Sequence, residues 1–253
     1  MKRLIALAFL LPVYICKAQN NGKSNTPSEK AIAYYTSRKK ISIPNYDYSK
    51  IEKIINKIKP TSEEDADGEN YILNSNIYNR LSLREKFTYN MIHPEKYVQN
   101  YDSPQIEEDA DKKIYAYPPE AFNNSYWSKR QTDFFKNNRD SILFLTKECI
   151  ENNNRIGSNY KQVIIDLNAI ELIPVLIKTV KETETDHDIL TVLNLLMKYG
   201  NYVPFTKSQM YETLYGSDDA SSDSFISFNK ENEDLILKNA MDFYNENIKK
   251  PSE

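Results

Sequence analysis

An acidic stretch at residues 63–69 has the residue types and spacing of a calcium-binding loop. Glu63, Asp65 and Asp67 alternate along it and Gly68 follows, so oxygen ligands could converge where the glycine allows a sharp turn. The bidentate acid expected at the end of such a loop is replaced by Asn74, which predicts weak affinity. Two interpretations stay open, a weak Ca²⁺ site and a solvated acidic loop, and no other cofactor is expected.

Other residues that serve catalysis occur without a catalytic arrangement. His187 is flanked by Asp186 and Asp188 at a predicted helix start, but adjacent residues of a helix point in different directions. Cys149 shares the apolar face of its predicted helix with Leu145, which indicates a buried thiol. The sequence has no nucleophile elbow, phosphate-binding glycine loop or zinc-protease helix. We therefore favour a protein that is not an enzyme and name no catalytic residue.

Aromatic residues are the strongest candidates for a binding surface. The chain has 19 tyrosines, and four clustered aromatic residues are candidate partner contacts: Tyr115, Tyr117, Tyr126 and Trp127. Rings with a polar tip favour contacts with proteins or glycans. The alternative is that these rings seal the faces of packed helices.

The first 18 residues have the pattern of a secretory signal peptide. Lys2 and Arg3 precede a short apolar run, and cleavage between Ala18 and Gln19 is expected. The mature protein is then secreted or periplasmic. The alternative is an outer-membrane lipoprotein anchored through Cys16, and only then do we expect membrane contact.

Charge and composition narrow the partners and the fold. Removal of Lys2, Arg3 and Lys17 changes the formal charge from −3 to −6, which argues against a nucleic-acid partner. No later stretch approaches the roughly 18 apolar residues of a transmembrane helix. Only 5 glycines occur in 253 residues, and this scarcity disfavours a turn-rich β-sandwich and favours helices.

The elements that must position these residues are predicted to be helices. Ser49 with Glu52 and Ser82 with Glu85 have capping-box spacing, and the patterns after Trp127 are helical throughout. We predict an all-α fold, an irregular α-α layered array with a loop-rich segment near 97–125. The predicted parts are a signal peptide, a flexible leader, an N-terminal helical and loop-rich portion and a C-terminal HEAT-like portion, at 1–18, 19–27, 28–125 and 126–250.

Residues 168–200 resemble one HEAT-type helical repeat. The stretch Asn168-Ala-Ile-Glu-Leu-Ile-Pro-Val-Leu-Ile is similar to a first repeat helix, and Leu193 to Gly200 is similar to the end of a second. The resemblance implies that Pro174 bends the first helix and that Gly200 ends the second in a left-handed conformation. Such repeats usually have an arginine where Asp186 to Asp188 stand. By analogy of fold, the resemblance implies stacked helix pairs and binding rather than catalysis.

Three functions follow from these features. The first is a secreted or cell-envelope binding or scaffold protein that engages a protein or glycan through a helical-repeat surface. The second is an extracytoplasmic hydrolase that uses acids of the 63–69 loop, the 107–111 loop or the Asp186 to Asp188 group. The third is an inhibitor or immunity-type protein, for which the charge of −6 would steer a basic partner.

Overall fold

A computed structural model of the 253-residue chain describes residues 26–62, 68–99, 106–153, 155–183, 186–216 and 224–248. The predicted signal peptide, with Cys16, Ala18 and Gln19, lies outside the described residues, as do the proposed calcium ligands Glu63, Asp65 and Asp67. Both predictions therefore stay predictions.

Helices dominate the described residues, which confirms the predicted all-α class. The first six are α1 (Glu29–Lys39), α2 (Tyr48–Ile55), α3 (Ser75–Arg80), α4 (Leu83–Ile92), α5 (Lys129–Asn137) and α6 (Arg139–Asn153). The next six are α7 (Ser158–Asp166), α8 (Ile173–Thr183), α9 (Asp188–Tyr199), α10 (Val203–Thr206), α11 (Gln209–Tyr215) and α12 (Lys230–Ile248). Two short 3₁₀ helices are η1 (Ala110–Lys112) and η2 (Ile170–Leu172). None of the described helices is long and apolar enough to cross a membrane.

The strands are short and form antiparallel pairs. Strand β1 (Thr61–Ser62) pairs with β2 (Glu69–Asn70), β3 (Lys96–Tyr97) with β5 (Ser125–Tyr126), and β4 (Lys113–Tyr115) with β6 (Phe225–Ser227). The described part of the predicted loop-rich segment, near 97–125, holds only η1, β4 and parts of two other strands besides turns and loops. This segment therefore joins helices that lie far apart in the sequence.

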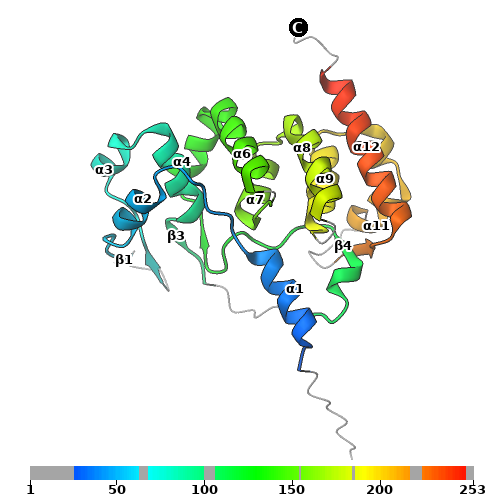
Figure 1. Cartoon of the computed structure of the whole chain (residues 1–253), viewed down its shortest axis with the longest axis horizontal. Helices are drawn as coiled ribbons and strands as arrows, with labels where there is room; N and C mark the ends of the chain where they lie inside the picture. Colours follow the sequence, from blue (N-terminus) through cyan, green and yellow to red (C-terminus); the bar gives the residue numbers. More distant parts are fainter. Residues whose placement is uncertain are drawn as a thin grey trace, which may run out of the picture.

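The helices form an elongated row (Figure 1). Helices α2, α3 and α4 lie at one end, α6 and α7 in the middle, and α8, α9 and α12 towards the other end, with α1 below the row beside β4. Helix α9 is the centre of the C-terminal part, because it contacts α7, α8, α10, α12 and β4. Its twelve residues are buried almost throughout, in agreement with its apolar sequence.

Two hydrophobic cores hold this row together. The larger core contains Phe87 and Ile114 as well as Leu176 and Leu193, so it joins helices from before and after the loop-rich segment. The smaller core lies between α2 and α4, around Ile51. Burial of such side chains contributes about 1.5–3 kcal/mol each to folding.

Local capping signals predict one helix start correctly and another incorrectly. At α4, the Ser82 side chain accepts a hydrogen bond from the backbone N–H of Glu85, and the Glu85 side chain accepts one from the Ser82 N–H, as the capping box predicts. The box at Ser49 does not form. Helix α2 begins at Tyr48 after Asp47, which has a left-handed φ of 51°, and the carboxylate of Glu52 accepts a hydrogen bond from Tyr48.

Two details implied by the HEAT resemblance are wrong. Pro174 is the second residue of α8, in the first turn, where a proline interrupts no helical hydrogen bond and need not bend the helix. Gly200 follows α9 with a φ of −79°, and the left-handed residue is Asn201, with a φ of 52°. Asparagine tolerates this conformation better than most residues, so the chain turns one residue later than predicted.

Candidate functional site

Helix α7 presents a small polar group on an otherwise buried helix. Tyr160, Val163 and Ile164 are buried in the larger core. Gln162 and Asp166 lie four residues apart and therefore share the opposite face, where Gln162 donates a 2.7 Å hydrogen bond from Nε2 to Oδ1 of Asp166. This face forms the floor of two neighbouring cavities.

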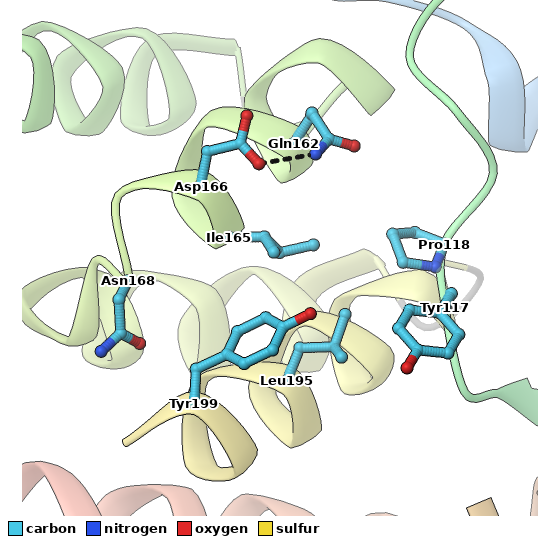
Figure 2. Close-up of a pocket in the computed structure, with 8 residues that line it drawn as sticks. All are labelled: Tyr117, Pro118, Gln162, Ile165, Asp166, Asn168, Leu195 and Tyr199. Atoms are coloured by element: carbon cyan, nitrogen blue, oxygen red, sulfur yellow. Dashed lines mark hydrogen bonds between the residues drawn. The ribbon is translucent and has the colours of Figure 1, made fainter. Parts of the chain in front are cut away.

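Cavity A, of about 430 Å³, lies between α7, the loop after β4 and the end of α9. Figure 2 shows Ile165 and the Gln162–Asp166 pair on α7, with Tyr117 and Pro118 opposite them on the loop and Leu195 and Tyr199 on α9. Asn168 completes the lining just after α7 ends, in a left-handed conformation with a φ of 42°.

Cavity B, of about 440 Å³, lies on the other side of the same pair. Aromatic rings form much of its wall, because Phe122, Tyr126 and Trp127 all line it. The indole N–H of Trp127 donates a 2.6 Å hydrogen bond to the carbonyl of Asn90, and this bond fixes the ring. The other lining residues are Val98, Glu120, Ala121, Ser125, Thr132, Gln162 and Asp166.

The two cavities share Gln162 and Asp166 and so adjoin each other at this pair. We call the combined surface, made of the lining residues of both cavities, the α7 groove. Each cavity falls in the range of roughly 300–1,000 Å³ that is usual for ligand pockets. The groove is the candidate functional site.

The Asp166 residue as a whole is exposed, but protein atoms surround part of its carboxylate. Partial burial raises its pKa, and the hydrogen bond from Gln162 and the charge of Lys136 offset this only in part. No lysine or arginine among the described residues forms an ion pair with Asp166 or with Glu120. The floor and wall of the groove therefore carry two carboxylates with which no described cation forms an ion pair.

Three of the four predicted binding residues line the α7 groove. Tyr117 lines cavity A, and its hydroxyl accepts a 2.9 Å hydrogen bond from Nζ of Lys198. Tyr126, 51% exposed, and Trp127, 8% exposed, line cavity B. Tyr115 lines neither cavity; it is buried, and its hydroxyl donates to Glu107.

Gln162 and Asp166 are not among the site residues that the sequence predicts. Their spacing of four residues on an otherwise apolar helix was the available signal. That signal does not distinguish a solvated helix face from the floor of a groove. The distinction depends on the loop at 117–127, which is distant in sequence and packs opposite α7.

The Asp186 to Asp188 group belongs to a buried ion network that attaches α1 to the helical array. Asp188 accepts hydrogen bonds from Nε and Nη2 of Arg38, at 3.1 and 2.8 Å, and lies 3.6 Å from Nζ of Lys161. Lys161 is 2.5 Å from Asp186. Burial by itself raises the pKa of the Asp188 carboxyl, but the charges of Lys161 and Arg38 outweigh it, and the pKa is lowered. His187 stacks on Phe228, with ring centroids 3.6 Å apart.

A second buried network centres on Glu95. Its carboxylate accepts hydrogen bonds from Arg130, from the hydroxyl of Tyr89 at 2.7 Å and from the hydroxyl of Ser128 at 2.6 Å. Burial alone raises the pKa of Glu95, but these hydrogen bonds outweigh burial and the pKa is lowered, so the group stays ionised. This network fixes the start of α5 against the end of α4, behind the wall of cavity B.

The remaining chemical candidates have structural surroundings. In the 107–111 loop, Glu108 accepts hydrogen bonds from Ser28 at the start of α1, and Asp111 pairs with Lys30 at 2.5 Å. Cys149 is buried, and burial raises the pKa of its thiol, which disfavours a nucleophilic thiolate. Within the described ranges, no three His, Cys, Asp or Glu side chains are grouped to hold a metal ion.

Comparison with protein-family models, with curated proteins and with solved structures finds no match to this chain. The function must therefore be inferred from the site itself.

Proposed function

We propose that this chain is a secreted or cell-envelope binding module that engages a protein or glycan partner through the α7 groove. The observation that carries the proposal is that two cavities adjoin across Gln162 and Asp166. Together they offer a binding surface longer than a single pocket.

The composition and the setting of the groove support this proposal. Tyr117, Tyr126 and Tyr199 combine an apolar ring with a polar tip, a residue type that contributes strongly at interfaces. Helices α7 and α9 have their opposite faces buried in the larger core, so the groove stands on rigid elements. A rigid site loses little conformational entropy when a partner binds.

Exposed tyrosines of the groove allow a direct test. Tyr126→Ala and Tyr199→Ala each remove a side chain that lines one cavity, and these residues are 51% and 46% exposed, so little stability should be lost. Phe144→Ala is the matched control, because Phe144 is 62% exposed on α6 and lines neither cavity.

The measurement is quantitative retention of envelope proteins and glycans on the immobilised mature chain, residues 19–253. We expect both tyrosine variants to retain the partner at least about fivefold less well, as for truncation of a residue that contributes more than 1 kcal/mol. The Phe144→Ala variant should match the wild type. Equal retention by a Tyr126→Ala/Tyr199→Ala double variant would refute the proposal.

One observation supports the alternative that the protein is a hydrolase, and this alternative can be tested. Glu120 and Asp166 line the same cavity, and a carboxyl group with a raised pKa can act as a general acid. A hydrolase would cleave a panel of peptides and polysaccharides, and Asp166→Asn would abolish that cleavage. If the wild type cleaves a substrate and the Asp166→Asn variant does not, the protein is a hydrolase and the binding proposal is wrong.

A further inference from the structure

We propose that the partner of the α7 groove is a polypeptide segment with a basic side chain, whose cationic group binds in cavity B at Asp166 and Glu120. This inference rests on the proposed binding function and specifies its ligand. It follows from the charges of cavity B, from its aromatic wall and from the way this fold holds its own cations.

The two carboxylates of cavity B have no ion-pair partner in the described part of the chain. Several other acids are paired, as Glu95 is with Arg130 and Glu171 with Arg139. Asp166 and Glu120 form no ion pair among the described residues, and Lys136, whose charge acts on Asp166, is not within ion-pair distance. Because partly buried carboxylates are stabilised by a nearby opposite charge, a cationic ligand group would supply what the cavity lacks.

The aromatic wall suits the same kind of group. Rings stabilise a cation positioned over their faces, and the alkyl stem of a lysine or arginine can pack along apolar surface. Phe122 and Tyr126 supply rings in cavity B, while Val98 and Ala121 supply apolar surface. A long basic side chain could therefore pack its stem on the wall and bring its charge to the carboxylates.

The fold uses this combination for its own cations in three places. The guanidinium of Arg38 binds Asp188 and lies 4.4 Å from the centre of the Tyr115 ring. Arg130 binds Glu95 and lies 4.3 Å from the Tyr78 ring centre.

The third place is at Lys113, whose Nζ lies 2.6 Å from a carboxylate oxygen of Glu107 and 4.1 Å from the Phe225 ring centre. Cavity B combines the same two kinds of group, carboxylates and aromatic rings. We therefore expect the cation to come from a ligand.

A polypeptide fits the whole groove better than a glycan does. Cavity A adjoins the carboxylates and is lined by Ile165, Leu195 and Pro118, which suit an apolar or aromatic side chain next to the basic one. A neutral glycan would leave Asp166 and Glu120 without a counter-charge. The expected charge of −6 on the mature chain would also attract a basic segment.

Trp127 provides a local signal for the test, because it is the only tryptophan of the chain and lines cavity B. The mature chain is titrated with an N-acetylated, C-amidated peptide, Gly-Phe-Lys-Phe-Gly, and binding is followed by tryptophan fluorescence and by calorimetry. The comparison ligands are the same peptide with norleucine in place of lysine, which keeps the stem but not the charge, and a chito-oligosaccharide. The protein variants are Asp166→Asn, Glu120→Gln and the control Glu246→Gln. Glu246 is an exposed acid of α12 that lines neither cavity, so its change removes one charge elsewhere.

We expect saturable binding of the lysine peptide and about tenfold weaker binding of the norleucine peptide, as for loss of one charged partner of a partly buried pair. Asp166→Asn should weaken the lysine peptide about tenfold, Glu120→Gln should weaken it as well, and Glu246→Gln should leave it unchanged. Equal affinity for both peptides, an unaffected Asp166→Asn variant or no binding of either peptide would overturn the inference. Binding of the norleucine peptide or the oligosaccharide alone would overturn the cationic ligand while keeping a binding groove. The tyrosine variants described above test the groove separately.

Discussion

Asp188→Asn is the substitution that most directly tests the buried ion network between α1 and the helical array. The change keeps the size of the side chain and removes its charge. In the wild type, Arg38 donates three hydrogen bonds to the two carboxylate oxygens, at 3.1, 3.1 and 2.8 Å, and Lys161 lies 3.6 Å away. The Asp188 and Lys161 side chains are each only 2% exposed. The variant leaves Lys161 with Asp186 and takes from Arg38 the carboxylate that it binds.

The expected cost follows from that imbalance. Removing one partner of a buried ion pair costs about 3–5 kcal/mol, because the remaining charge stays buried without compensation. Domains are stable by only about 5–15 kcal/mol, so this is a large share of the total. For a chain of this size, 1 kcal/mol corresponds to roughly 2–4 °C in Tm, so the melting temperature should fall by about 6–20 °C.

Urea unfolding at neutral pH measures this loss, and Asp133→Asn is the matched control. Asp133 is 45% exposed and pairs with Lys129, which is 87% exposed, at 2.5 Å on the same helix, so its loss should cost only a few tenths of a kcal/mol. An Asp188→Asn variant within about 1 kcal/mol of the wild type would show that the network contributes little, contrary to the reasoning from burial.

The pH dependence gives an independent check. The pKa of Asp188 is lowered in the folded protein, so its stabilising effect is complete above its unfolded value of 3.8 and is lost as the pH falls towards the folded value. The asparagine variant has no carboxylate to protonate at this position. The difference in stability between the two proteins should therefore be constant near neutral pH and shrink below about pH 4. A difference that grows on acidification would contradict the assigned charge state.

Two further predictions concern the backbone and the N-terminus. Gly157→Ala should destabilise the protein by about 1–3 kcal/mol in a thermal melt, because the added Cβ would lie 2.1 Å from the backbone nitrogen of Ser42; an unchanged Tm would mean that this backbone contact yields freely. Mass spectrometry of the exported protein should give a chain that begins at Gln19, whereas a lipid-modified chain beginning at Cys16 would establish the lipoprotein alternative.

Local sequence signals predicted the fold class and the start of α4. The capping box at Ser82 formed as expected because both of its partners lie within one turn. The box at Ser49 failed because Asp47 and Tyr48 provide a competing start two residues earlier. Gly200 and Asn201 compete in the same way at the end of α9. Where two nearby residues can each begin or end the same helix, spacing alone does not select between them.

The ion network was missed for a different reason. The sequence pattern places Asp186 and Asp188 close together on one helix, where neighbouring side chains point in different directions. Asp186 in fact lies before α9 begins, so both acids reach Lys161. A lysine in the middle of α7 indicates a solvated position by its type alone. Its burial depends on Arg38 and both acids, which come from distant parts of the chain.

The sequence by itself determined the helical class, and it offered Tyr117 and Tyr126 as candidates without deciding whether they are exposed. Scarce glycine and helical periodicity are local properties, and they survive in any packing. Only the tertiary structure decided that Tyr115 is buried and that the other aromatic candidates line the two sides of the Gln162–Asp166 pair. A groove is a relation between an α-helix and a loop distant from it in sequence, so its shape and its uncompensated charge arise only when they pack together.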